Sequence, residues 1–239
     1  GRGAIPPVLN QPALAGTYQT PAIHVRVRGM FTNTVPTDVY RGAGRPEAVY
    51  LLERLIDKAA DELNVDRVEL RRLNIIPADA FPYKTPLGLT YDGGLFERNL
   101  DEGLRRIDWE GMELRRAEAK ARGTRRGIGL ANYVERSGHG VTQDATLRVG
   151  HDGRVTVLIG TMSNGQGHET AYAQIAAELL GLDPDQVEVI QGDTDLIARG
   201  KGTGGSWSIP VGGAAMAKAS DAVIDKGKDI AAHLLEASD

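Results

Sequence analysis

Three short polar loops are the segments of this sequence whose residue types best suit the binding of an anion. Each contains glycine and precedes a pattern typical of a helix; they cover residues 40–48, 162–170 and 200–208. A helix N-terminus offers backbone N–H groups without intrahelical partners and the positive end of the helix dipole. Glycine lets the chain approach a ligand closely or adopt a positive φ angle. Together the three loops predict a polyanionic ligand that is held at several points.

The loop at 40–48 places Arg41 beside Gly42 and ahead of Pro46, which we expect in the first turn of a helix. A guanidinium on a tight turn can bind a phosphate or carboxylate through two parallel hydrogen bonds. An ordinary helix start with Arg41 in solvent has the same residue pattern and is common. The residue types leave both interpretations open.

The loop at 162–170 joins an apolar strand pattern to a helix pattern, with Gln166 between Gly165 and Gly167. The Gln166 amide could both donate to and accept from a heterocycle. The loop lacks the lysine and spacing of a Walker loop and does not match the G-x-G-x-x-G dinucleotide fingerprint. The structural alternative is that Ser163 or Asn164 caps the following helix.

The loop at 200–208 carries Ser206 and Ser208 beside Gly205, ahead of a helix pattern that starts near Pro210. Hydroxyl and amide groups in this arrangement suit the oxygens of a phosphate or pterin. A flexible linker would be similarly rich in glycine, but Trp207 is unusual in such a linker.

Hydrophobic periodicity predicts the elements that hold these loops. The helices are expected at 46–63, 66–75, 95–107, 109–122, 168–180 and 210–235. In the second helix we expect Asp66 as the cap and Val68, Leu70 and Leu73 facing inward. Alternation predicts strands at 24–28, 128–133, 145–149, 155–159 and 187–191. Asp152-Gly153 predicts a hairpin turn between the third and fourth of these strands.

These elements predict an α+β fold, with mixed strands and helices in one body over residues 1–239. A sub-boundary near residue 123 would separate two parts: 1–123, mostly helical after an N-terminal strand, and 124–239, strands plus two helices. Residues 77–95 contain three prolines and are expected to form a long surface loop.

The composition excludes several classes of protein. The chain has no cysteine, which excludes disulfides and thiolate metal sites, so an iron–sulfur centre would have to lie on another chain or segment. The net charge of -4, without a sustained basic stripe, argues against nucleic-acid binding. No apolar run approaches the roughly 20 residues of a membrane span, so we expect a cytoplasmic protein. The sequence begins at Gly1, and we expect it to derive from a longer chain.

No metal site is expected from the residue spacing. The five histidines, at positions 24, 139, 151, 168 and 233, lack the spacing of metal ligands. Asp193 and Asp195 suit a turn-capping role better than a cation site.

Four motifs occur in the order in which they occur in one known family. They are Tyr40-Arg41 through Glu47-Ala48, Gly165 through Thr170 with Tyr172 through Ile175, Gln191-Gly192-Asp193-Thr194-Asp195, and Gly205-Ser206-Trp207-Ser208 with Pro210 and Gly213-Ala214-Ala215. In this respect the chain resembles the large subunit of molybdenum hydroxylases, the family of xanthine dehydrogenase, aldehyde oxidase and aerobic carbon monoxide dehydrogenase. The similarity is closest to the carbon monoxide dehydrogenase branch.

The resemblance implies a molybdopterin-binding region, with the cofactor often in its cytosine dinucleotide form. By resemblance Gly165, Gln166, Gly167, His168 and Thr170 would contact the pterin or its phosphates, as would Gly205, Ser206 and Ser208. Arg41 and Gly42 would lie beside the molybdenum. Carbon monoxide dehydrogenases have a copper-binding cysteine where this chain has Gly42. The resemblance therefore favours hydroxylation of an aldehyde or N-heterocycle.

The family's catalytic glutamate, and the glutamine that contacts the apical oxo ligand, lie outside the matching segment. We therefore expect no catalytic residue in this chain and no activity of the chain alone. The implied partners are the remainder of the large subunit, an iron–sulfur small subunit, an FAD-carrying medium subunit and a small-molecule substrate. Two alternatives remain at this point: a non-catalytic module that binds phosphate or nucleotide, and an excised folding unit without a ligand.

Overall fold

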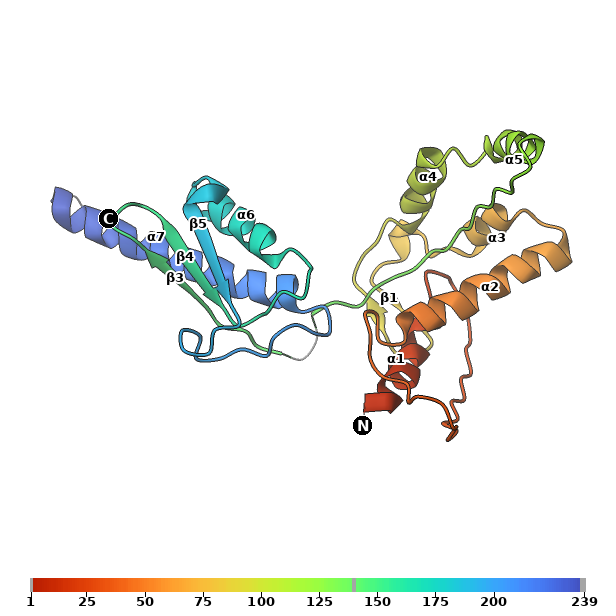
Figure 1. The fold of residues 1–239 in the computed structure, drawn as a ribbon, viewed down its shortest axis with the longest axis horizontal. Helices are drawn as coiled ribbons and strands as arrows, with labels where there is room; N and C mark the ends of the chain where they lie inside the picture. Colours follow the sequence, from red (N-terminus) through yellow and green to blue (C-terminus); the bar gives the residue numbers. More distant parts are fainter. Residues whose placement is uncertain (1, 139–140, 237–239) are drawn as a thin grey trace. The chain divides into compact units, whose positions relative to one another are not determined.

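The computed structural model describes residues 2–138 and 141–236, so His139 lies outside the described residues. The chain forms two compact units, Gly1–Glu135 (unit 1) and Arg136–Asp239 (unit 2), shown in Figure 1. The division falls at 135/136, whereas the sequence suggested a sub-boundary near residue 123. Both helices and small sheets are present, which agrees with the expected α+β class. No helix within the described residues is both long enough and apolar enough to cross a membrane.

Unit 1 is mainly helical. Its elements are η1 (Arg2–Ala4), α1 (Ile5–Ala13), α2 (Arg45–Leu63), α3 (Arg67–Asn74), η2 (Ala78–Ala80), β1 (Tyr83–Lys84), β2 (Thr90–Tyr91), α4 (Phe96–Arg106) and α5 (Met112–Ala121). The four helices expected between residues 46 and 122 are confirmed as α2 to α5. Asp66 caps α3 as predicted, since its Oδ1 accepts from the backbone N–H groups of Val68 and Glu69 at 2.8 and 3.0 Å. The expected loop at 77–95 contains η2 and the short antiparallel pair β1–β2.

Two predicted strands in unit 1 are wrong. Residues 24–28 and 128–133 alternate in polarity but have no secondary structure, because neither segment meets a partner strand with which to form a ladder. The chain also begins with a helix rather than a strand. Pro6 lies in the first turn of α1, where its missing N–H group costs nothing.

A buried arginine replaces a leucine that was expected inside unit 1. Leu73 is 70% exposed, whereas Arg71, two residues earlier on α3, is fully buried. Burial of a charged side chain requires paired partners. Arg71 Nε lies 2.9 Å from Glu53 Oε2, and its Nη1 lies 2.9 Å from Asp57 Oδ1. These ion pairs connect α3 to α2, and the Tyr18 hydroxyl donates to Glu53 Oε1 at 2.7 Å.

Unit 2 contains a three-stranded sheet with two long helices. Its elements are β3 (Ala145–Val149), β4 (Val155–Ile159), α6 (His168–Leu180), η3 (Pro184–Gln186), β5 (Val187–Gln191), the π-helical turn η4 (Ser208–Gly213) and α7 (Ala214–Leu235). The last three predicted strands and the helix at 168–180 are confirmed. The helix expected from residue 210 is present, with its first turn wound as η4.

The sheet order is β3-β4-β5. β3 and β4 are antiparallel and joined by the predicted Asp152-Gly153 turn, in which Gly153 has a φ of 78°. β4 and β5 are parallel, and α6 forms the crossover between them. Parallel neighbours require such a crossover, and it brings the carboxyl ends of both strands to the same edge of the sheet.

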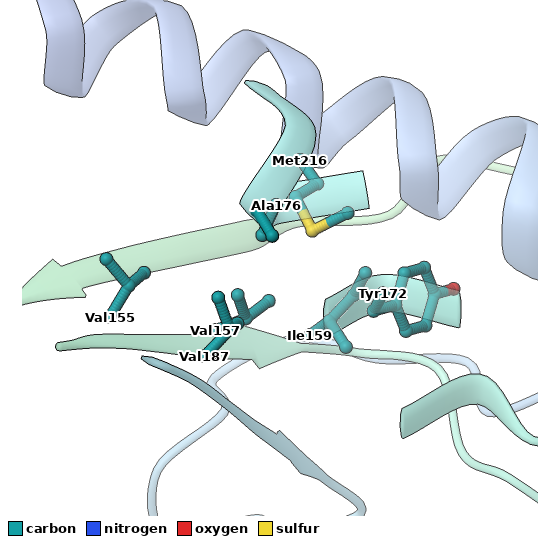
Figure 2. Packing of buried hydrophobic residues seen from close by; sticks show 8 residues of the cluster. Val155, Val157, Ile159, Tyr172, Ala176, Val187 and Met216 are labelled. Carbon is teal, nitrogen blue, oxygen red and sulfur yellow. The ribbon is translucent and has the colours of Figure 1, made fainter. Parts of the chain in front are cut away.

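Both helices of unit 2 pack on one face of this sheet. Val155, Val157 and Ile159 alternate along β4 and are buried against Tyr172 and Ala176 of α6, with Met216 of α7 in the same cluster (Figure 2). A period of two places these three β4 side chains on one face. This core holds the N-terminal end of α6 beside the carboxyl ends of β4 and β5.

Candidate functional site

The candidate site of unit 2 lies where the parallel strands β4 and β5 end. Ligands of open sheets with parallel strands bind outside the carboxyl ends of the strands, where loops and helix N-termini meet. The chain leaves β4 at Gly160 and reaches α6 through residues 161–167, and it leaves β5 through residues 192–196. Two of the predicted motifs therefore meet at one edge of the sheet.

The N-terminus of α6 has an open backbone. Its N-cap is Gly167, with a φ of 73° and no side-chain hydrogen bond to the cap. The structural alternative, in which Ser163 or Asn164 caps this helix, is therefore wrong. Gln166 and Thr170 are exposed, and the Gln166 Oε1 accepts from the backbone N–H of Asn164. The first N–H groups of α6 thus remain available to an anion.

His168, the first residue of α6, has an orphaned nitrogen. Its side chain is 5% exposed, and its Nδ1 is buried without a hydrogen-bond partner among the described residues. An unsatisfied buried polar atom is unusual and calls for a partner. This atom and the open amides fit a ligand with several acceptor and donor groups, as a pterin with its phosphate has.

The loop at 200–208 lies directly against the loop that follows β4. The Gly202 N–H donates to the Gly160 carbonyl at 3.1 Å, and Thr203 Oγ1 donates to the Met162 carbonyl at 2.6 Å. A Cβ on Gly160 would lie 2.4 Å from the Arg199 carbonyl oxygen. Glycine is needed at this position because the two backbones touch. The second and third predicted loops therefore lie in direct contact.

The two serines of the third loop differ in exposure. Ser206 is exposed and has a φ of 53°, while Ser208 is 6% exposed. The Ser208 hydroxyl lies 2.9 Å from Thr203 Oγ1, inside the loop. Trp207 donates its Nε1–H to the Gly202 carbonyl at 3.0 Å, which closes the loop on itself. Of the two, Ser206 is the one whose side chain faces outward.

The segment after β5 is shaped by an aspartate cap. Asp193 Oδ1 accepts from the backbone N–H groups of Asp195 and Leu196 at 2.9 and 3.2 Å. This is the turn-capping role expected for Asp193. Across the described part of the chain, no group of three or more histidine and carboxylate side chains could hold a metal ion.

The remaining predicted loop lies in unit 1. Gly42, Ala43 and Gly44 have φ angles of 91°, 47° and 104°, so the turn before α2 runs through the left-handed region for three residues. A Cβ on Gly44 would lie 2.0 Å from the Pro6 carbonyl oxygen. Arg41 is exposed, and Arg45, four residues further along the chain, forms an ion pair with Glu135 at 2.6 Å. The turn thus presents Arg41 on a tightly constrained backbone.

A groove of about 740 Å³ in unit 1 contains none of the candidate residues. Two of its arginines are already paired, Arg72 with Asp101 at 2.5 Å and Arg105 with Glu102 at 2.7 Å. Its lining residues are Asp66, Val68, Arg72, Asp101, Leu104, Arg105, Asp108, Trp109 and Glu110. Both arginines of the lining are therefore neutralised by neighbouring carboxylates of the same unit.

Sequence reasoning missed the buried polar groups beneath these loops. Thr161 and Tyr172 are fully buried, and the Thr161 hydroxyl lies 3.1 Å from the Tyr172 hydroxyl. Gln191 Nε2 donates to Glu169 Oε1 at 3.1 Å. A threonine two residues after an apolar strand was the one signal that could have indicated them.

Comparison with known proteins identifies the family. Residues 102–239 and 4–75 match two models, each described as a molybdopterin cofactor-binding domain. The chain belongs to the large-subunit family of molybdenum hydroxylases and comprises a molybdopterin-binding region of it.

Its relatives include the carbon monoxide dehydrogenase large chain of Hydrogenophaga pseudoflava, 37% identical over 94% of this chain and 30% of that protein. The gamma subunit of the 6-hydroxypseudooxynicotine dehydrogenase complex of Paenarthrobacter nicotinovorans is 33% identical over 93% of this chain and 29% of that protein. Quinoline 2-oxidoreductase from Pseudomonas putida 86 superposes with a TM-score of 0.84 at 31% identity, over 99% of this chain and 31% of that one. The chain thus spans about 30% of the length of each of these three relatives.

Proposed function

We propose that the loops at 162–170 and 200–208 bind the pterin and phosphate of a molybdenum cofactor, within an enzyme that hydroxylates an aldehyde or an N-heterocycle. The observation that carries the proposal is the contact between these loops at the N-terminus of α6, where Thr203 donates to the Met162 carbonyl. Two glycine-rich loops, open amides and a helix N-terminus then face one ligand.

The residues of the site divide into two roles. The exposed groups, Gln166, Thr170 and Ser206, and the amides of Gly165, Gly167 and Gly205 would contact the cofactor. His168 would satisfy its buried Nδ1 there. Ser208 would contribute through the loop shape, because its hydroxyl is engaged by Thr203.

The cofactor itself, when bound, supplies the redox centre that accepts electrons from the substrate. This chain contributes binding, orientation and exclusion of water. Arg41 and Gly42 would line the substrate side. Gly42 carries no side chain that could ligate copper, which supports an organic small-molecule substrate over carbon monoxide. We infer a molybdopterin in either its plain or its cytosine dinucleotide form.

We infer that the catalytic base lies outside this chain. Glu169, in the first turn of α6, accepts from Gln191, and Glu135 is paired with Arg45. The activity would then require the remainder of the large subunit, an iron–sulfur small subunit and an FAD-carrying medium subunit, in the cytoplasm. This chain alone would be inactive.

The test is the molybdenum and pterin content of the complex that contains this chain, purified from its host. Metal analysis and the fluorescence of the oxidised pterin should give one molybdenum and one pterin for each copy of the chain. Bound nucleotide without pterin, or the absence of pterin from the complex, would overturn the proposal.

A further inference from the structure

One buried hydroxyl connects the segments that form the candidate site. The Tyr172 hydroxyl, on α6, donates to the Ser208 carbonyl at 2.7 Å and lies 3.1 Å from Thr161 Oγ1. Tyr172 is fully buried. Its ring packs beside Ile159, and its oxygen points away from the valines of the cluster (Figure 2). The aromatic ring therefore belongs to the core, while the oxygen serves the loops.

The backbone of η4 passes close to this hydroxyl at a glycine. A Cβ on Gly212 would lie 2.7 Å from the Tyr172 oxygen, so the π-helical turn η4 can approach only because residue 212 is glycine. π-helical turns are rare and are often found at functional sites. Burial raises the pKa of Tyr172, so the hydroxyl keeps its proton and donates to Ser208.

The network continues to the neighbouring strand and back to α6. Thr161 Oγ1 also lies 3.2 Å from Gln191 Oε1, and Gln191 Nε2 donates to Glu169 Oε1. Thr161 has one proton, which it can give either to Tyr172 or to Gln191. The rings of Tyr172 and His168 lie 5.7 Å apart on successive turns of α6. One network thus reaches the end of β4, the end of β5, the start of α6 and the third loop.

We propose that Tyr172 is a positioning residue for cofactor binding, and that its buried hydroxyl holds the loop with Ser206 and Ser208 in place against the N-terminus of α6. This inference rests on the proposed function. Tyr172 does not touch the cofactor in this account. It acts through the Ser208 carbonyl, and the Thr161 hydroxyl contacts the same Tyr172 oxygen.

The test uses near-isosteric variants of the assembled enzyme and measures the rate of pterin release. Tyr172→Phe and Thr161→Val remove a hydroxyl but keep the volume, whereas Thr161→Ser keeps the hydroxyl and loses a methyl group. Loss of a buried hydrogen bond should speed pterin release by about three- to tenfold in the first two variants. Thr161→Ser should stay within about twofold of the wild type, because the hydrogen bond is retained.

Ile159→Val is the matched control, because it removes one methyl group from the same core without touching the network. It should lower the thermal midpoint comparably to Tyr172→Phe while pterin release stays at the wild-type rate. The inference is overturned if the rate of pterin release rises in step with the fall in thermal midpoint in all four variants. It is also overturned if Thr161→Ser releases pterin as fast as Thr161→Val. A wild-type complex that holds pterin, with unchanged release in Tyr172→Phe, would overturn this inference alone. A wild-type complex without pterin would overturn the proposed function and this inference with it.

Discussion

A Cβ placed on Gly42 would lie 2.4 Å from the Cδ of Pro46, the residue at the start of α2. Gly42 also has a φ of 91°, which L-residues rarely adopt. A side chain at this position of the turn is therefore disfavoured for two separate reasons. Arg41 and Gly42 are the residues that we propose to lie on the substrate side.

We expect Gly42→Cys to destabilise unit 1 by about 2–4 kcal/mol, as the sum of backbone strain and the clash with Pro46. Pro46→Ala should relieve the clash but not the strain. Denaturant unfolding of the two single variants and the double variant should therefore show that the double variant is more stable than the sum of the single changes predicts. Additive free energies would contradict the steric contact between these residues.

The ion pairs of Arg71 should dominate the stability of unit 1. Arg71→Met would leave the buried carboxylate of Glu53 without its charge partner, which costs about 3–5 kcal/mol of unfolding free energy. Arg72→Met is the control, since Arg72 is partly exposed and its pair with Asp101 contributes at most about 1 kcal/mol. Equal losses in the two variants would refute the role assigned to Arg71.

We expect the Tyr91 hydroxyl to lose its proton only at strongly alkaline pH. Burial, and then the charge of the nearby Tyr83, raises the pKa of Tyr91 to about 12. This folded-state pKa lies above that of the unfolded chain. The contribution of Tyr91 to the free energy of unfolding is therefore fully present below about pH 10 and is lost as the pH rises through about 12. Absorbance titration at the phenolate band should show one late-ionising tyrosine fewer in Tyr91→Phe than in the wild type. An unchanged number of late-ionising groups would contradict the prediction.

The contact between Gly160 and the third loop should be necessary for cofactor retention. The Cβ of Gly160→Ala would meet the backbone of Arg199 and Gly200, so the third loop would have to move away from the loop after β4. We expect most of the pterin to be lost from the purified complex. Gly227→Ala is the control, because a Cβ at this site of α7 meets nothing within 4 Å. Full pterin content in Gly160→Ala would show that the two loops act independently.

Local signals in the sequence predicted most of the elements. The Asp66 cap, the Asp152-Gly153 turn and the helix at 168–180 each depend on residues within a few positions of one another, so the sequence pattern suffices. The segment 24–28 shows the limit of such patterns: alternation describes a strand only where a second strand is available. Arg71 was missed for a related reason, since its burial depends on Glu53, eighteen residues earlier.

The sequence predicted the two loops of the candidate site individually, but not the direct contact between them. The glycines and polar residues of both loops stand out in the sequence, and the order of the motifs indicated the family. That Thr203 reaches the Met162 carbonyl, 41 residues away, follows only from the packing of η4 and α6 on the sheet. The supporting side chains, Thr161 and Tyr172, resemble ordinary core residues until their hydrogen bonds are seen.

The most direct test of the central claim is hydrogen–deuterium exchange of the complex with and without its molybdenum cofactor. We expect the amides of residues 165–170 and 204–208 to exchange more slowly when the cofactor is bound. The hairpin turn at 150–153, at the other end of β4, should exchange equally in both states. Equal exchange in the two loops, with or without the cofactor, would contradict the claim that they bind the pterin.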